Sequence, residues 1–206
     1  MSINYKTVPY IYHRLPAQED LYALYRNNAS VIKIEPSSVL DFSHPVKLPK
    51  GRKAQIARAK REGVIVSETT DFDTFIALEN EVLAQRHDTK AVHTGAELAL
   101  LHGRFPENIK CVGAFLNGKL IAGTVLFIYE NVVHTQYLAA DETAREIGAL
   151  DLVIASCVEH YKESKRYFDF GISTEDLGRV LNTGLIAQKE SFGARTIAYQ
   201  AWKIDY

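Results

Sequence analysis

The chain has 206 residues, of which 47% are hydrophobic and 24% charged, and its formal net charge is -1 at pH 7. This composition is typical of a globular chain with one sizeable core, and it excludes a disordered polar chain and any overall charge bias toward nucleic acid. No run of about 18 apolar residues is present, so the sequence predicts no membrane span. The first residues lack a continuous apolar core, so we expect no signal peptide. The two cysteines, Cys111 and Cys157, favour a reducing compartment, and we expect a cytoplasmic chain.

Residues 1–46 differ in composition from the rest of the chain, because they are rich in tyrosine and contain four prolines. The pattern predicts a short helix over Glu19–Arg26 and extended segments elsewhere. An arm of this length cannot bury a core of its own. We therefore expect an incomplete partner domain that packs on a main domain at 47–206 or on another chain, and a homodimer contact is one candidate role for its tyrosines.

The segment from Lys47 to Arg61 holds seven Lys or Arg residues and no acid. Helix-forming residues dominate after Gly51, and Gly63 is placed as a helix C-cap. Arg58 and Arg61 lie one helical turn apart, so they could hold one phosphate of a substrate, of a cofactor or of RNA. The alternative is a solvated helix face without a ligand.

The next segments alternate between strand and helix patterns. Residues 63–70 predict a strand, Asp71 caps a helix with an apolar stripe, and Thr94 with Glu97 forms a capping box for a second helix. Residues 109–116 and 119–129 predict two strands joined by Asn117-Gly118, which is a strong hairpin signal.

The part from 131 to 204 predicts a strand, a polar turn, a buried helix, a second strand, an amphipathic helix and a last strand. The resulting order is β-α-α-β-β-β-α-β-α-β. Hairpins make the first strand pairs antiparallel, and the crossover helix makes the pair of Val132–Ala140 with Tyr167–Ser173 parallel. The sequence therefore predicts a mixed α/β fold, with a central mixed sheet and helices on both faces.

Three motifs in this part carry a family resemblance. The turn holds Arg145 and Gly148 in the pattern R-x-x-G-x-L, the second strand reads YFDFG, and the last helix reads GLIAQKESFGA. Over residues 63–204 the chain resembles the GNAT N-acyltransferase superfamily, in its Fem-like branch. Members of that branch usually have two copies of the fold or a fuller N-terminal partner, whereas this chain has room for one copy and an arm.

The resemblance implies that an acyl-CoA donor, with acetyl as the first candidate, lies between the two parallel strands and rests its diphosphate on the turn. A glycine there lets the backbone come close, and the amides at the helix start point outward. The family has Gly or Ala where Leu150 stands, so the cradle is wider or partly blocked here. The alternative is an ordinary connecting turn. The implied cofactor contacts are Leu138, Ala139, Arg145, Ile147, Gly148, Ala149 and Leu150.

Alternation places His134 and Gln136 on one face of the first strand and Asp169 on one face of the second. If these faces align, His134 is a candidate general base that Asp169 orients, or Asp169 is itself the base, and Gln136 contacts substrate. Ser173 could protonate the leaving thiolate. The structural alternatives are a His that is simply hydrogen-bonded in place, and turn-forming roles for Asp169 and Ser173.

Lys189 lies near the apolar stripe of the last helix. The resemblance implies contact with acceptor or cofactor, and the alternative is a stem that covers the core with its ammonium in water. Asn182 is placed as the cap of that helix. No histidine or cysteine spacing indicates a metal site, and no G-x-S-x-G, Walker or G-x-G-x-x-G motif is present.

The function that the resemblance implies is direct transfer of an acyl group from coenzyme A to an amino group of a sugar or other small molecule. One alternative is a Fem-type transferase whose donor is aminoacyl-tRNA, in which case the basic segment contacts tRNA. Another is a catalytically silent relative that binds a partner or a sugar.

Overall fold

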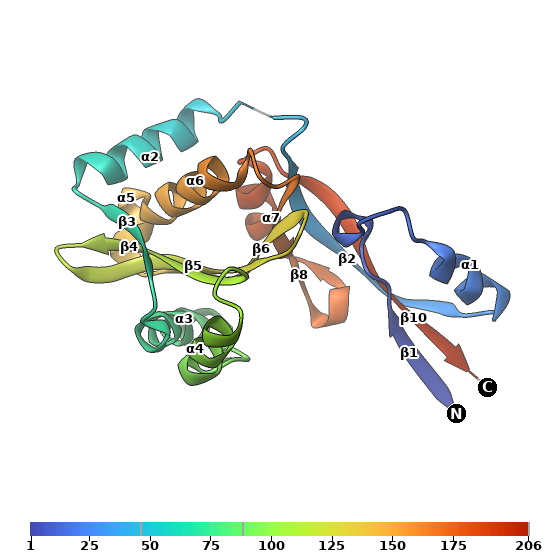
Figure 1. Ribbon diagram of the computed structural model, residues 1–206. Coiled ribbons are helices and arrows are strands. Elements are labelled where there is room, and N and C mark those ends of the chain that lie inside the picture. The colour runs from blue at the N-terminus through green and yellow to red at the C-terminus, as the bar shows by residue number, and fades with distance from the viewer. Residues whose placement is uncertain (46, 88, 206) are drawn as a thin grey trace. The chain divides into compact units, whose positions relative to one another are not determined.

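The computed structural model describes residues 1–45, 47–87 and 89–205 (Figure 1). The chain forms two compact units. The terminal unit consists of residues 1–47, 130–132 and 165–206, and the central unit of residues 48–129 and 133–164. The units do not follow chain order, because the N-terminal arm shares a unit with the C-terminal segment.

The sheet of the central unit is antiparallel, with strand order β6-β5-β4-β3. Its strands are β3 (Ile65–Thr69), β4 (Ile109–Leu116), β5 (Lys119–Ile128) and β6 (Val132–Ala140), the last of which begins in the terminal unit. Asn117 and Gly118 both have positive φ, 51° and 79°, as a two-residue type I′ turn requires. The predicted hairpin is confirmed.

Helices lie on both faces of this central sheet (Figure 1). On one face are α3 (Phe72–His87) and α4 (Gly95–Arg104), and on the other are α2 (Lys50–Arg61), α5 (Glu142–Ile147) and α6 (Ala149–Tyr161). Phe75 and Leu98 are fully buried against the sheet in a cluster with Val125 and Tyr137. The predicted caps are confirmed, because Asp71 accepts the Thr74 N–H and Thr94 with Glu97 forms a capping box.

The polar turn predicted between β6 and α6 is wrong in one respect, since most of it is the helix α5. Asp141 caps α5 by accepting the Ala144 N–H at 2.8 Å, and Gly148 ends it with φ of 79°. Arg145 therefore lies on a helix and not in a loop. The six-residue helix is too short to give a periodic pattern, so only its cap residues could have revealed it.

The terminal unit has an antiparallel sheet in the order β1-β10-β2-β7. Its strands are β1 (Ser2–Lys6), β2 (Ser30–Asp41), β7 (Tyr167–Ile172) and β10 (Arg195–Asp205), with a small β8 (Thr174–Glu175) and β9 (Val180–Leu181) pair beside them. The arm thus supplies β2, a strand of 12 residues paired on both edges.

The helical segments of the terminal unit are α1 (Glu19–Arg26), α7 (Thr183–Glu190) and the 3-10 turns η1 (Tyr10–Tyr12) and η2 (Asp176–Gly178). The helix predicted at Glu19–Arg26 is confirmed, and Asn182 caps α7 by accepting the Leu185 N–H at 2.9 Å. The parallel pairing expected between Val132–Ala140 and Tyr167–Ser173 would join the two units and stays a prediction. Among the described residues, no helix is both long and apolar enough to cross a bilayer.

Replacing the fully buried Phe75 by Ala should lower the free energy of unfolding by about 3–5 kcal/mol, because the large ring leaves a cavity between α3 and the sheet. Phe105, whose side chain is 53% exposed, is the matched control, and its change to Ala should cost less than about 1 kcal/mol. Urea unfolding followed by circular dichroism measures both. Equal costs would contradict the assigned core.

Candidate functional site

A buried carboxylate organises the polar interior of the terminal unit. Asp169, on β7, has no exposed surface. Its Oδ1 accepts hydrogen bonds from the Ser37 hydroxyl at 2.6 Å and the Gly171 N–H at 2.9 Å. Its Oδ2 accepts from the hydroxyls of Tyr12 at 2.7 Å and Tyr199 at 2.5 Å. We call these residues the Asp169 network; it joins β7 to β2, η1 and β10.

The four donors determine what Asp169 can do chemically. An ionised carboxylate offers about four lone-pair sites, so four donors occupy its accepting capacity. Burial, followed by the negative charge of Asp169, raises the pKa of Tyr12 and of Tyr199, so both phenols stay protonated and keep donating. This geometry counts against Asp169 as a general base and supports a positioning role.

Lys189, on α7, is buried in the same unit, with 5% of its surface exposed. Its ammonium donates to the backbone carbonyls of Gly171 at 3.0 Å and Ile172 at 2.6 Å. Burial lowers the pKa of Lys189 to about 8, and the negative charge of Asp169 opposes that shift. The alternative in which this ammonium lies in water is therefore wrong. A buried amine that titrates near pH 8 can carry or release a proton under ordinary conditions.

Ser173 follows β7 and has no exposed surface. Its backbone is fixed, since its N–H donates to the Pro36 carbonyl and its own carbonyl accepts the Asn182 N–H. Among the described residues, its hydroxyl has no hydrogen-bond partner, and the same holds for the buried hydroxyl of Ser38. An unpaired buried hydroxyl costs free energy, so each is a position where a ligand atom or a water would be stabilising.

The residues predicted on β6 lie in the central unit. His134, Gln136 and Leu138 are partly exposed while Thr135 and Tyr137 are buried, as the alternation predicts. Opposite β5, the register passes from Val125–Tyr137 to Leu126–Thr135, so Gln136 is the extra residue of a β-bulge. A bulge locally interrupts the ladder and re-aims side chains. The convergence of His134 and Gln136 with Asp169 would join the two units and stays a prediction.

The helix start predicted to hold a diphosphate is covered by α2 within the central unit. A Cβ on Gly148 would lie 2.8 Å from both the Cβ and the carbonyl oxygen of Gln55. Asp151, in the first turn of α6, receives both its contacts at 2.7 and 2.6 Å from the Arg52 guanidinium. Ile147 and Ala149 are buried, as is Ala139 of β6, whereas Leu150 is partly exposed. Arg145 is exposed, as are Glu142, Thr143 and Glu146 of α5. Because Gln55 packs directly against Gly148, the geometry counts against an open diphosphate cradle.

Arg58 and Arg61 are exposed on α2, while Ala59 between them is fully buried. Arg52, which the sequence did not single out, is the basic residue of α2 that pairs inside the unit, with Asp151. Arg58 and Arg61 thus remain candidate phosphate ligands on the outer surface of the helix.

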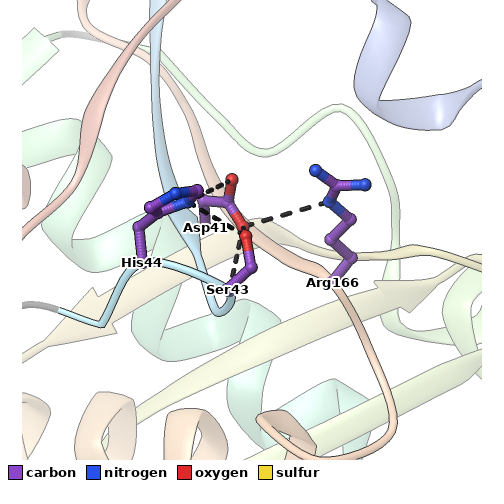
Figure 2. Close-up of polar contacts among 4 residues, drawn as sticks. All are labelled: Asp41, Ser43, His44 and Arg166. Atoms are coloured by element: carbon purple, nitrogen blue, oxygen red, sulfur yellow. Dashed lines mark hydrogen bonds and ion pairs between the residues drawn. The ribbon is translucent and has the colours of Figure 1, made fainter.

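A second polar cluster lies at the end of β2 (Figure 2). The Ser43 hydroxyl contacts Asp41 Oδ1 at 2.6 Å and His44 Nδ1 at 3.0 Å, and Asp41 Oδ2 lies 3.3 Å from the same Nδ1. A Ser–His–Asp relay needs serine and acid on opposite ring nitrogens. Both lie on Nδ1 here, so this grouping is a capped turn and not a hydrolytic triad. Burial acts to raise the pKa of Asp41, but hydrogen bonds from Ser43 and His44 and the charge of Arg166 lower it overall.

Sequence reasoning missed several of these residues. Ser37, Tyr12 and Tyr199 complete the Asp169 network, and the only available signal was the polar Ser37-Ser38 pair within an extended, otherwise apolar segment. The position of Asp151 within the otherwise apolar run of α6 was a signal that its carboxylate is buried and paired with a cation. Glu79 on α3 is also buried; its Oε2 has no partner among the described residues, and burial raises its pKa to about 7.

The lowered pKa of Lys189 predicts a particular pH dependence of stability. Its pKa in the unfolded chain is the ordinary 10.5, so between about pH 8 and 10.5 the unfolded state binds more protons. Relative to Lys189→Met, the natural chain should gain unfolding free energy as pH rises, by about 2 kcal/mol from pH 7 to 9.5. Urea unfolding of both proteins at the two pH values measures this. A difference that is independent of pH would contradict a buried titrating amine.

Comparison with known proteins identifies the family. The model of the acetyltransferase (GNAT) domain matches residues 50–177, more than half of the chain. Among solved structures, FemX covers 91% of this chain with a TM-score of 0.72 and 9% identity, and 68% of its own chain is matched.

Two further solved structures share the same fold. The C-terminal domain of a putative lysylphosphatidylglycerol synthetase from Agrobacterium fabrum has a TM-score of 0.67 and 13% identity over 90% of this chain and 64% of that one. The L-PGS structure from Bacillus licheniformis has a TM-score of 0.68 and 13% identity, over 89% of this chain and 65% of that one. This chain thus spans less than two thirds of either of these two chains. The comparison with curated proteins gave no match.

At these identities the solved structures establish the fold, and the family model establishes membership. The family model confirms the resemblance to the GNAT superfamily, and FemX shares the fold. The chain belongs to the GNAT acetyltransferase family and has its mixed α/β fold.

Proposed function

We propose that this chain transfers an acyl group from an activated carrier to an amine by direct attack. The match of the GNAT domain model over residues 50–177 carries the proposal. In the step, the amine nitrogen bonds to the acyl carbon, the bond to the carrier breaks, the amine proton passes to a base, and the carrier leaves with a proton.

The cysteines support direct transfer. An acyl-enzyme through sulfur needs a thiolate. Burial raises the pKa of both Cys111 and Cys157 to about 12, so neither thiol ionises near neutral pH. Transfer without a covalent intermediate is the mechanism consistent with these thiols.

The candidate residues take distinct roles in this proposal. His134 on β6 is the base that receives the amine proton, and Gln136 in the bulge contacts the substrate. Lys189 and Ser173 contact the acceptor or the acyl carbonyl, since a buried ammonium and a buried hydroxyl stabilise developing negative charge. Asp169 keeps Gly171 and the neighbouring backbone in place and so positions Lys189.

Acyl-CoA, with acetyl as the acyl group, is the first donor that we propose, because the family model is that of an acetyltransferase. The acceptor is the amino group of a sugar or another small molecule. Binding of the diphosphate at the start of α6 requires Gln55 and Arg52 of α2 to move away from Gly148 and Asp151. The exposed Arg145 would then contact the phosphates.

A second donor, aminoacyl-tRNA, is favoured by the covered start of α6. If α2 stays in place, the diphosphate has no cradle, and the exposed Arg58 and Arg61 on the same helix offer phosphate contacts instead. The structural likeness to FemX agrees with this candidate. Absence of transfer from both donors would favour the catalytically silent alternative.

Acetyl-CoA at 100 times its Kd should raise the free energy of unfolding by about 2.7 kcal/mol, which appears as a higher melting temperature. Arg145→Ala should weaken this binding about tenfold, since it removes one charge-assisted phosphate contact. Lys162→Ala is the control, because Lys162 is an exposed lysine at the far end of α6. No shift with acetyl-CoA or longer acyl-CoAs would rule out this donor.

For the tRNA donor, binding should weaken steeply as salt increases. Arg58→Ala and Arg61→Ala should each lower the slope of log K against log salt by about 0.7–0.9, because each removes one phosphate contact. Arg26→Ala, at an exposed arginine of α1, should leave the slope unchanged. Filter binding at several salt concentrations gives the slopes. Identical slopes for all three variants would contradict a tRNA contact on α2.

A further inference from the structure

A pocket of about 250 Å³ lies in the terminal unit, away from the residues assigned above. One wall is the segment from Thr7 to Tyr10, the opposite wall is the start of α1, and the floor is β10. Drug-sized ligands occupy pockets of about 300–1,000 Å³, so this one is suited to a ligand of a single ring.

The pocket combines an apolar face with polar groups held in fixed orientations. Tyr10 is 52% exposed, and its ring is held edge-on by Tyr167 at a centroid distance of 6.4 Å and an angle of 90°. With Pro9 it forms a rigid apolar wall. Gln200 lies on the floor, and its side-chain oxygen accepts from the Trp202 indole N–H at 3.1 Å, which turns the amide nitrogen into the available donor.

Asp20 is the charged residue among those that line the pocket. Its Oδ1 accepts the Leu21 N–H at 2.9 Å, and its Oδ2 accepts the Tyr5 hydroxyl at 3.2 Å. Within the described part of the chain these are its hydrogen bonds, and a carboxylate has about four lone-pair sites. A fixed carboxylate with remaining accepting capacity favours a ligand that carries an ammonium or hydroxyl groups.

We propose that this pocket binds a single hydroxylated ring that carries an amine, such as an amino sugar. The apolar C–H face of the ring packs on the apolar wall formed by Tyr10 and Pro9. The hydroxyls bond to Gln200 and to Thr196, and the ammonium pairs with Asp20.

The pocket shares two elements with the Asp169 network. The turn η1 carries Tyr10 to the pocket and Tyr12 to Asp169, and β10 lines the pocket with Ile197 and donates Tyr199 to Asp169. The inference that the pocket holds the acyl acceptor rests on the proposed function. The inference that it binds a sugar does not depend on that function.

The test uses the full chain and two probes, D-glucosamine and D-glucose, in titrations followed by amide NMR shifts. Glucosamine should bind saturably, with shifts at Thr196 and Gln200. Asp20→Asn should weaken glucosamine about tenfold and leave glucose unchanged, because Asn keeps the acceptor for Leu21 and loses the charge. Tyr10→Ala should weaken both sugars. Tyr25→Ala, at an aromatic residue of α1 that is 74% exposed, should weaken neither.

Lack of saturable binding by the natural chain, or natural affinity in both pocket variants, would overturn the proposal. If circular dichroism shows that a variant is unfolded, the NMR shifts of the natural chain are the deciding measurement. Shifts confined to residues outside the pocket would overturn the proposal. A transfer assay separates the two proposals. Glucosamine binding without transfer would count against the pocket as the acceptor site and leave it as a sugar site. Transfer to glucosamine that Asp20→Asn leaves unchanged would contradict this site and leave the proposed function in place.

Discussion

The terminal unit depends on one buried charge. Asp169 has no exposed surface and takes hydrogen bonds from β2, η1 and β10 as well as from its own strand. An isolated carboxylate would have a large desolvation cost in such a place, and the hydrogen bonds from these donors offset that cost. Elements that are distant in sequence are held together by this requirement. The N-terminal arm is therefore part of the site's scaffold, because Tyr12 and Ser37 both belong to it.

The same carboxylate acts on Lys189. Burial disfavours the ammonium, whereas the negative charge of Asp169 favours it, and the balance leaves the pKa at about 8. Without the Asp169 charge the amine would release its proton at lower pH still. The two backbone carbonyls that Lys189 contacts belong to Gly171 and Ile172, and Asp169 accepts the Gly171 N–H, so the carboxylate acts on the charge of the amine and on one of the residues that hold it. This coupling explains why a residue with no accepting capacity left still matters to the chemistry of its neighbour.

The sequence predicted local structure well, because its signals are local. Asp71, Thr94 with Glu97, Asn117-Gly118 and Asn182 each act within a few residues, and each predicted cap or turn is present. The family motifs were also contiguous. The partners of Asp169 were not predictable, since Ser37 is 132 residues and Tyr12 157 residues away in sequence. No spacing rule connects such positions, and a single sequence offers only the burial of a polar residue as a hint.

The start of α6 makes the same point about the limits of a motif. The R-x-x-G pattern predicts outward-facing amides, but the residue three positions after Gly148 is Asp151, whose carboxylate already supplies negative charge to the helix start. Arg52 neutralises that carboxylate, and both side chains are largely buried. A diphosphate arriving here would meet an acidic side chain and would have to detach Arg52, leaving a buried carboxylate unpaired. The helix start therefore carries an internal substitute for the anion, and a donor that places its phosphates on the outer surface of α2 avoids that cost.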